Sequence, residues 1–130
     1  MDWVEVFAVL LVCHLVGDFL LQTDWQAAHK RAGLGRDRER RRALIAHTSS
    51  YTLAFAPALA WLAGDIGAAG TAALAAGIFL PHLVQDDGRL LDAYMRNVKH
   101  TTPKRGMLMI AVDQTFHVLV LFGLAVAAGG

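Results

Sequence analysis

Basic residues are absent from most of this sequence. All 12 lysines and arginines lie in two segments, 30–42 and 89–105, and none occurs elsewhere in the 130 residues. Charged residues make up only 18% of the chain, whereas about a quarter is usual in soluble domains. Nucleic-acid-binding domains are usually strongly basic, whereas the formal net charge of this chain is only +1, so we expect no nucleic-acid partner.

Cysteine is nearly absent as well. Cys13 is the only one, so no disulfide can form within the chain. The first apolar run also lacks the basic start of a secretory signal, because it begins with Asp2 and Glu5 and no basic residue precedes Lys30. We therefore interpret this run as a retained helix.

Four apolar runs are long enough to cross a membrane. A bilayer core about 30 Å thick is spanned by about 20 helical residues. The runs predict an all-α polytopic membrane protein in which residues 1–130 form a single four-helix domain, with Pro57 bending the second helix. The expected spans are about 3–22, 43–63, 66–87 and 107–128, and the loops that carry the basic residues are 23–42 and 88–106.

The two basic segments set the expected orientation, because lysine and arginine accumulate in cytoplasmic loops. Loops 23–42 and 88–106 should face the cytoplasm, and both termini and the turn at 64–67 should lie outside. We expect a multi-pass protein of the plasma (inner) membrane. The arginines at 38 and 40–42 could bind anionic lipid. A homodimer is also open for so small a bundle.

Histidine and aspartate recur inside the apolar runs, in pairs four residues apart. The pairs are His14 with Asp18, His82 with Asp86, and Asp113 with His117, while His47 stands alone near the start of the second span. Residues four apart share one face of a helix. With the orientation taken from the basic loops alone, all seven lie in the cytoplasmic half of the bundle, so we expect them to meet.

The histidine and aspartate side chains need polar or charged partners, because each ionisable side chain in a membrane core costs several kcal/mol unless it is paired or hydrated. No lysine or arginine lies in the spans, so we expect no salt bridge there. A bound divalent cation would neutralise the carboxylates. Zinc is the first choice, and manganese and iron are the alternatives. His47 or Asp113 is the expected catalytic acid or base. The predicted metal ligands are His14, Asp18, His82, Asp86, Asp113 and His117.

These features form a set that covers nearly the whole chain. The set comprises His14-Leu-Val-Gly-Asp18-Phe-Leu-Leu-Gln22, Lys30, His47, His82-Leu-Val-Gln-Asp86 and Asp113-Gln114-Thr-Phe-His117. It resembles a family of small bacterial integral-membrane proteins catalogued as domain of unknown function 3307, which implies no established activity. The pattern is also distantly similar to bacterial membrane-bound metal-dependent hydrolases, which likewise place His and Asp pairs on transmembrane helices.

Three functions remain open. A metal-dependent hydrolase of an amphiphilic ester or phosphoester comes first, because it uses the whole set of polar residues. A transporter or channel for protons or metal ions needs polar access from both faces, and Thr52 and Thr71 are among the few polar residues of the outer half. A non-catalytic scaffold subunit is the third possibility, although polar contacts between helices contribute only about 0.6 kcal/mol each.

Overall fold

The computed structural model describes residues 1–130, which form helices and no strands. The all-α class predicted from the sequence is confirmed. The helical elements in chain order are α1 (Trp3–Leu15), the single π-helical segment η1 (Val16–Leu20), α2 (Asp24–His29), α3 (Arg38–Leu53), α4 (Ala56–Asp87), α5 (Arg89–Asn97) and α6 (Met107–Gly129).

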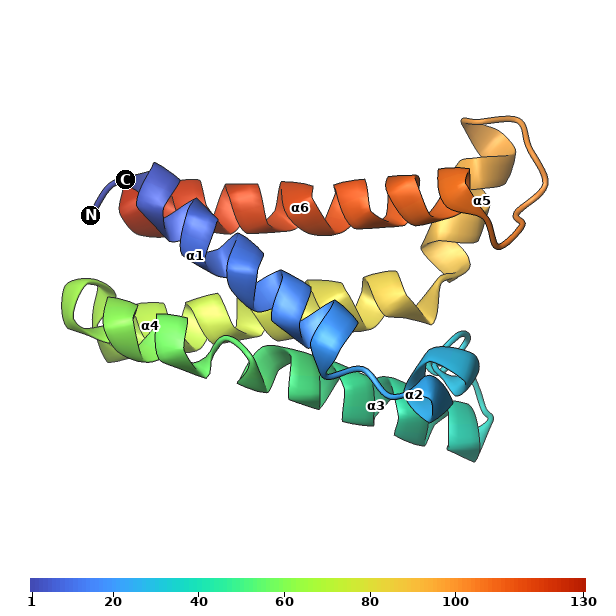
Figure 1. Cartoon of the computed structure of the whole chain (residues 1–130), viewed down its shortest axis with the longest axis horizontal. Helices are drawn as coiled ribbons and strands as arrows, with labels where there is room; N and C mark the ends of the chain where they lie inside the picture. The colour runs from blue at the N-terminus through green and yellow to red at the C-terminus, as the bar shows by residue number, and fades with distance from the viewer.

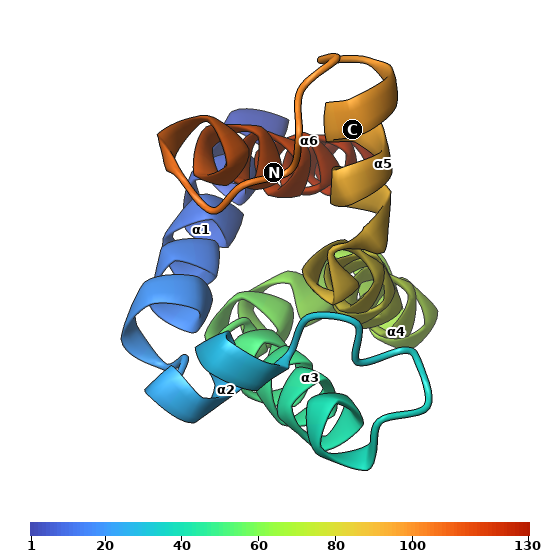
Figure 2. The same ribbon diagram turned by 90° about the vertical axis from the view of Figure 1, so that its right-hand side faces the viewer.

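The long helices lie lengthwise along the molecule, with α1 packed on α6, α3 on α4 and α4 on α6 (Figure 1). Both termini lie at one end of the bundle. The short helices α2 and α5, with the loops that carry the basic residues, lie at the opposite end (Figure 1). Viewed from that end, α2 covers α3 and α5 stands beside the start of α6 (Figure 2). The basic segments therefore share one end, as the sequence predicts.

Three helices, not the expected four, are each long and apolar enough to cross a membrane. They are Trp3–Leu20, Ala56–Asp87 and Met107–Gly129. The predicted second span, 43–63, is wrong as a single helix, since α3 ends at Leu53 and α4 begins at Ala56. Pro57 lies in the first turn of α4, where its missing N–H costs no hydrogen bond. It therefore starts a helix rather than bending one.

The long helix α4 reverses direction at Gly67. Its φ of 70° and ψ of 177° are values that residues with a Cβ rarely adopt. The ribbon turns back at this point, on the left of Figure 1. Consequently α3 and the first part of α4 run toward the end that holds the termini, and the second part of α4 returns toward α5.

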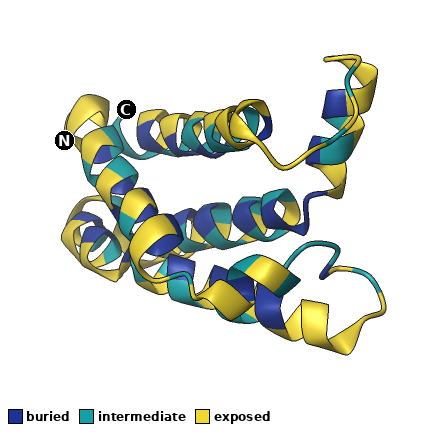
Figure 3. Cartoon of the chain, turned by 45° about the vertical axis from the view of Figure 1, so that its right-hand side comes forward, coloured by how far each residue is buried: buried dark blue, intermediate teal, exposed yellow.

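The interior of the bundle is apolar at the end that holds the chain termini. Much of the outer surface of the bundle is apolar as well. Exposed side chains include Phe19, Leu20 and Leu53, and buried positions face inward (Figure 3). So apolar an exterior fits a lipid environment. The buried core cluster comprises Val6, Leu10, Cys13, Tyr51, Phe55, Ala58, Leu62, Leu74, Ile78, Leu121 and Ala125.

The π-helical segment η1 approaches α3 closely at Gly17. A Cβ built on Gly17 would lie 2.7 Å from Cδ2 and 3.2 Å from Cα of Tyr51. Only glycine leaves room for this approach. The contact fixes η1, and with it Asp18, against α3.

Replacing Gly17 with alanine should therefore lower the stability of the protein by about 1–3 kcal/mol, because the added methyl group overpacks the contact with Tyr51. Thermal unfolding of the purified protein in detergent measures the effect. The matched control is Gly123→Ala, since a Cβ at Gly123 meets nothing within 4 Å. Equal losses in the two variants would contradict the close packing of η1 on α3.

Candidate metal centre

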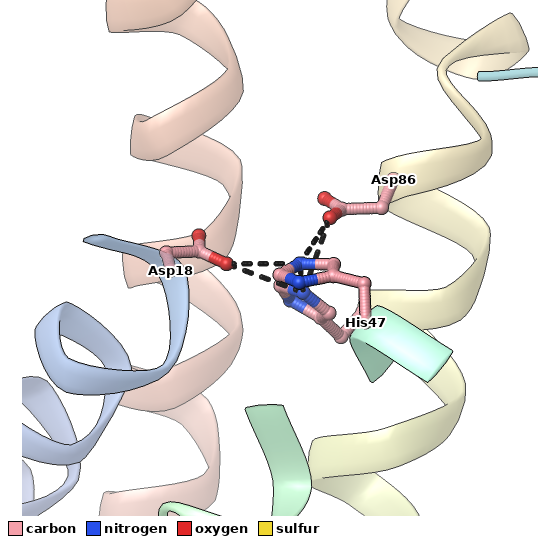
Figure 4. Close-up of side chains that lie close together, drawn as sticks. Asp18, His47 and Asp86 are labelled. Carbon is pink, nitrogen blue, oxygen red and sulfur yellow. Dashed lines mark hydrogen bonds and ion pairs between the residues drawn. The ribbon is translucent and has the colours of Figure 1, made fainter. Parts of the chain in front are cut away.

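Four buried side chains from three elements converge at the end of the bundle that carries the basic segments. Asp18 comes from η1, His47 from α3, and His82 and Asp86 from the last turns of α4. Figure 4 shows the side chains of Asp18, His47 and Asp86 pointing toward one another. None of the four is more than 8% exposed. The predicted meeting of these residues is thus present in the structure.

The two imidazoles point the same ring nitrogen at the same two carboxylates. His47 Nε2 lies 3.2 Å from Asp18 Oδ1 and 2.8 Å from Asp86 Oδ2. His82 Nε2 lies 3.4 Å and 3.2 Å from the same two oxygens, and the two Nε2 atoms are 3.0 Å apart. These four atoms, two nitrogens and two oxygens, form the four-ligand group of the site.

The spacing within the four-ligand group matches a small coordination sphere. Zinc binds nitrogen and oxygen at about 2.0–2.1 Å, so neighbouring ligands of a tetrahedral ion are about 3.3 Å apart. The separations from 2.8 to 3.4 Å lie close to that value. The group could therefore hold a metal ion.

Several polar atoms of this group lack hydrogen bonds. Asp18 Oδ1 is buried without a hydrogen-bond partner, although it faces both imidazoles. Leaving such an atom unsatisfied costs about 1–3 kcal/mol, and more for a charged group. The Nδ1 atoms of His47 and His82 also have no partner, whereas most metal-ligating histidines donate from that position. Asp18 Oδ1 is therefore the atom that a cation at the centre would satisfy.

A second group shares Asp86 with the first and adds Asp113 and His117. His117 Nε2 lies 3.0 Å from Asp86 Oδ1, and its Nδ1 lies 2.8 Å from the backbone oxygen of Asp113. Both ring nitrogens thus face oxygen acceptors, an arrangement that suits the imidazolium form. The Asp113 carboxylate is 3.8 Å from His117 Nδ1 and makes no hydrogen bond.

His14, a predicted ligand, lies outside both groups. Its Nδ1 faces the Tyr51 hydroxyl at 2.9 Å, and its Nε2 faces Gln114 Oε1 at 2.8 Å. The Gln114 amide in turn donates to Asp18 Oδ2 at 3.4 Å. His14 therefore reaches Asp18 through Gln114 and through a longer contact of 3.7 Å. In this arrangement it orients the carboxylate.

Tyr51 was not singled out from the sequence, yet it contacts much of the site. Its ring stacks on the His82 imidazole, with centroids 3.4 Å apart and planes 6° from parallel. The same side chain bonds His14 and packs beneath Gly17. Nothing in the sequence marks Tyr51 as a site residue, because a tyrosine in an apolar run is typical of the hydrophobic core.

The expectation that no salt bridge would neutralise the acids is wrong. Lys30 Nζ lies 2.7 Å from Asp86 Oδ2 and 2.6 Å from Gln22 Oε1. Lys30 directly follows α2, which packs on α3, and its long side chain reaches from there into the site. A count of the charged residues within the spans does not include Lys30, because Lys30 lies in the loop between two spans. Lys30 compensates Asp86 but makes no ion pair with Asp18.

Residues 6–128 match a family described as Protein of unknown function (DUF3307). The chain belongs to the DUF3307 family. The matched range includes every residue of both groups and Lys30. No curated protein and no solved structure matches the chain. Since the DUF3307 description names no reaction, the function of this DUF3307 protein has to be argued from the site itself.

Substituting Lys30 with methionine should destabilise the metal-free protein by about 2 kcal/mol, because Asp86 then loses its ammonium partner in a largely buried place. Unfolding in detergent with a chelator present measures this loss. Lys99→Met is the matched control, since Lys99 is exposed and forms no ion pair. A Lys30→Met variant as stable as the wild type would show that the Lys30–Asp86 salt bridge does not stabilise the fold.

Proposed function

We propose that this protein is an integral membrane protein that binds a divalent metal ion and uses it to hydrolyse an amphiphilic ester or phosphoester. The ligands are Asp18, His47, His82 and Asp86. The proposal rests on the four-ligand group: five of the six separations among its atoms are 2.8–3.4 Å, close to those of a tetrahedral ion, and Asp18 Oδ1 is buried there without a hydrogen bond. Zinc fits this spacing and donor set, with manganese or iron as alternatives.

The proposed placement in the membrane follows from charge. The basic segments lie at one end and both termini at the other (Figure 1). By the distribution of lysine and arginine, the basic end faces the cytoplasm and the termini face outward across the plasma membrane. The reversal at Gly67 lets α3 and the first part of α4 cross together as one broken span. In this placement the metal ligands lie near the cytoplasmic surface.

Access from one side favours a reaction over transport. A cavity of about 210 Å³ at the basic end is lined by Lys30, Asp86 and Asp113 among others. Toward the termini, the interior is packed with apolar side chains such as Leu10, Phe55 and Ile78, and a cavity of about 220 Å³ between α4 and α6 is lined almost wholly by apolar residues. A transporter needs a route on both sides of its binding site. Within the core cluster the Tyr51 hydroxyl lies beside His14, and Leu10, Phe55 and Ile78 offer no polar atoms to continue a route toward the termini.

Asp18, His47, His82 and Asp86 would hold a divalent ion, which would supply an acidified water and polarise the bond under attack. Asp113 is the residue we assign as general base, because its carboxylate lines the cavity, is 28% exposed and makes no hydrogen bond. His47, the other candidate, lies in the four-ligand group. Hydrolysis then forms a bond from the water oxygen to carbon or phosphorus. The ester bond breaks, and Asp113 takes the water proton and passes it to the leaving oxygen, which departs as an alcohol.

Elemental analysis of the purified protein tests the metal site. The wild type should carry at least one divalent ion per chain, and His82→Ala should lose about nine-tenths of it, because the tetrahedral set is broken. His14→Gln should retain the ion, since His14 lies outside both groups. His100→Ala, in an exposed loop, is the control. A wild type free of metal, or full retention in His82→Ala, overturns the proposal.

A separate assay tests the role of Asp113. In the metal-loaded protein, Asp113→Asn should retain the ion in the four-ligand group and slow hydrolysis of long-chain nitrophenyl esters and phosphodiesters by about 10²–10⁴-fold. Asp37→Asn, which removes a carboxylate from an exposed position outside the site, should leave the rate unchanged. Undiminished hydrolysis by Asp113→Asn would contradict the assignment of the base.

A further inference from the structure

Two cavities adjoin at the end of the bundle that carries the basic segments. The first, of about 210 Å³, is the one that reaches Asp86, and the second, of about 270 Å³, lies between α5 and α6. They share Gln85, Leu91 and Asp113 as lining residues. Ligand pockets usually measure about 300–1,000 Å³, so the joined pair reaches the lower part of that range while each alone does not.

Three basic residues and two carboxylates, Asp86 and Asp113, line the first cavity. Lys30, Arg31 and Arg105 all line it. Lys30 is paired with Asp86, and Arg31 is paired with Asp92 at 2.6 Å. Arg105 is exposed and forms no ion pair. A cation that lines a cavity without a partner of its own favours an anionic ligand there.

The second cavity is mainly apolar. It is lined by Leu90, Leu91, Tyr94 and Phe116, together with the shared Gln85 and Asp113. The rings of Tyr94 and Phe116 meet edge to face with centroids 5.0 Å apart. Leu90 is 66% exposed, so the cavity wall reaches the outer surface of α5. An amphipathic helix such as α5 fits the boundary between lipid and water.

The geometry points to an anionic amphiphile as the ligand of the joined cavities, with its acidic head group at Arg105 and Lys30 and its hydrocarbon chain along Leu90, Tyr94 and Phe116. This inference rests on the proposed function, for which it names the substrate class. A head group in the first cavity would lie beside Asp86, which belongs to the four-ligand group, and beside Asp113. Charge complementarity selects the head and the apolar wall selects the tail.

A free inorganic anion is the competing source of the same head-group chemistry. It would use Arg105 and Lys30 but leave Leu90, Tyr94 and Phe116 without a role. The position of both cavities at the membrane-boundary end favours the lipid, because its chain can enter from the bilayer while the head stays at the aqueous side. The two sources differ in their dependence on the apolar cavity, and that difference can be measured.

The experiment uses the full chain in dodecyl maltoside and isothermal titration with three probes: oleoyl lysophosphatidate, oleoyl lysophosphatidylcholine and inorganic phosphate. Lysophosphatidate should bind about tenfold tighter than the zwitterionic lipid. Arg105→Gln should weaken lysophosphatidate about fivefold, the effect of about one lost cation near an anionic head. Leu90→Gln should weaken both lipids and leave phosphate unchanged.

Matched controls separate the pocket from general charge and apolarity. Arg42→Gln removes the same charge, and Leu34→Gln makes the same exchange, at exposed positions that line neither cavity. Both should bind like the wild type. Equal binding of the two lipids overturns the inference, as does phosphate binding as tightly as lysophosphatidate. An Arg42→Gln loss equal to that of Arg105→Gln also overturns it.

Measuring each titration with and without added zinc keeps this inference apart from the proposed function. Charge-selective lipid binding in a protein that elemental analysis finds free of metal would support the pocket and reject the metalloenzyme. A metal-loaded protein that does not distinguish the two lipids would reject the pocket and leave the metal site standing.

Discussion

The burial of two carboxylates, Asp18 and Asp86, in an otherwise apolar bundle is the constraint on which the rest of the structure depends. Neither is exposed enough for water to compensate it. Asp86 contacts Lys30, which lies outside the spans, through one oxygen and His117 of α6 through the other. Asp18 receives only a long hydrogen bond from Gln114 and faces two imidazoles. The charge of Asp86 is thus better compensated than that of Asp18. The poorly compensated oxygen of Asp18 lies where the four ligand atoms meet.

Tyr51 joins this polar end to the apolar remainder of the bundle. It belongs to the buried core cluster that contains Phe55 and Leu62, yet its hydroxyl bonds His14 and its ring stacks on His82. The close approach of η1 at Gly17 rests on the same side chain. Packing in the core therefore sets the orientation of the polar residues, because moving Tyr51 would shift a histidine on each side. Rigid support of this kind is what a metal or catalytic site requires.

Much of this arrangement could be predicted from the sequence, because its determinants are local. Apolar length predicts the helices, and a spacing of four places His82 and Asp86 on one face. Lys30, by contrast, lies near the site only because α2 folds back on α3, a tertiary contact that no periodicity encodes. The span expected at 43–63 failed as a single helix for a related reason. Hydropathy averages over a window and does not register Pro57 starting a helix, whereas the reversal at Gly67 falls within the turn expected at 64–67.

Ligand binding and folding are coupled in such a site. The four-ligand group draws on η1, α3 and α4, and Asp18 Oδ1 is left without a partner when these elements meet. An ion bound there would satisfy that oxygen and tie the three elements together, so part of its binding free energy would appear as stability of the bundle. Lys30 contacts the same Asp86 oxygen from the loop that follows α2. Occupation of the centre must therefore shift the charge balance felt by Lys30, which also lines the cavity where an anionic head group would arrive.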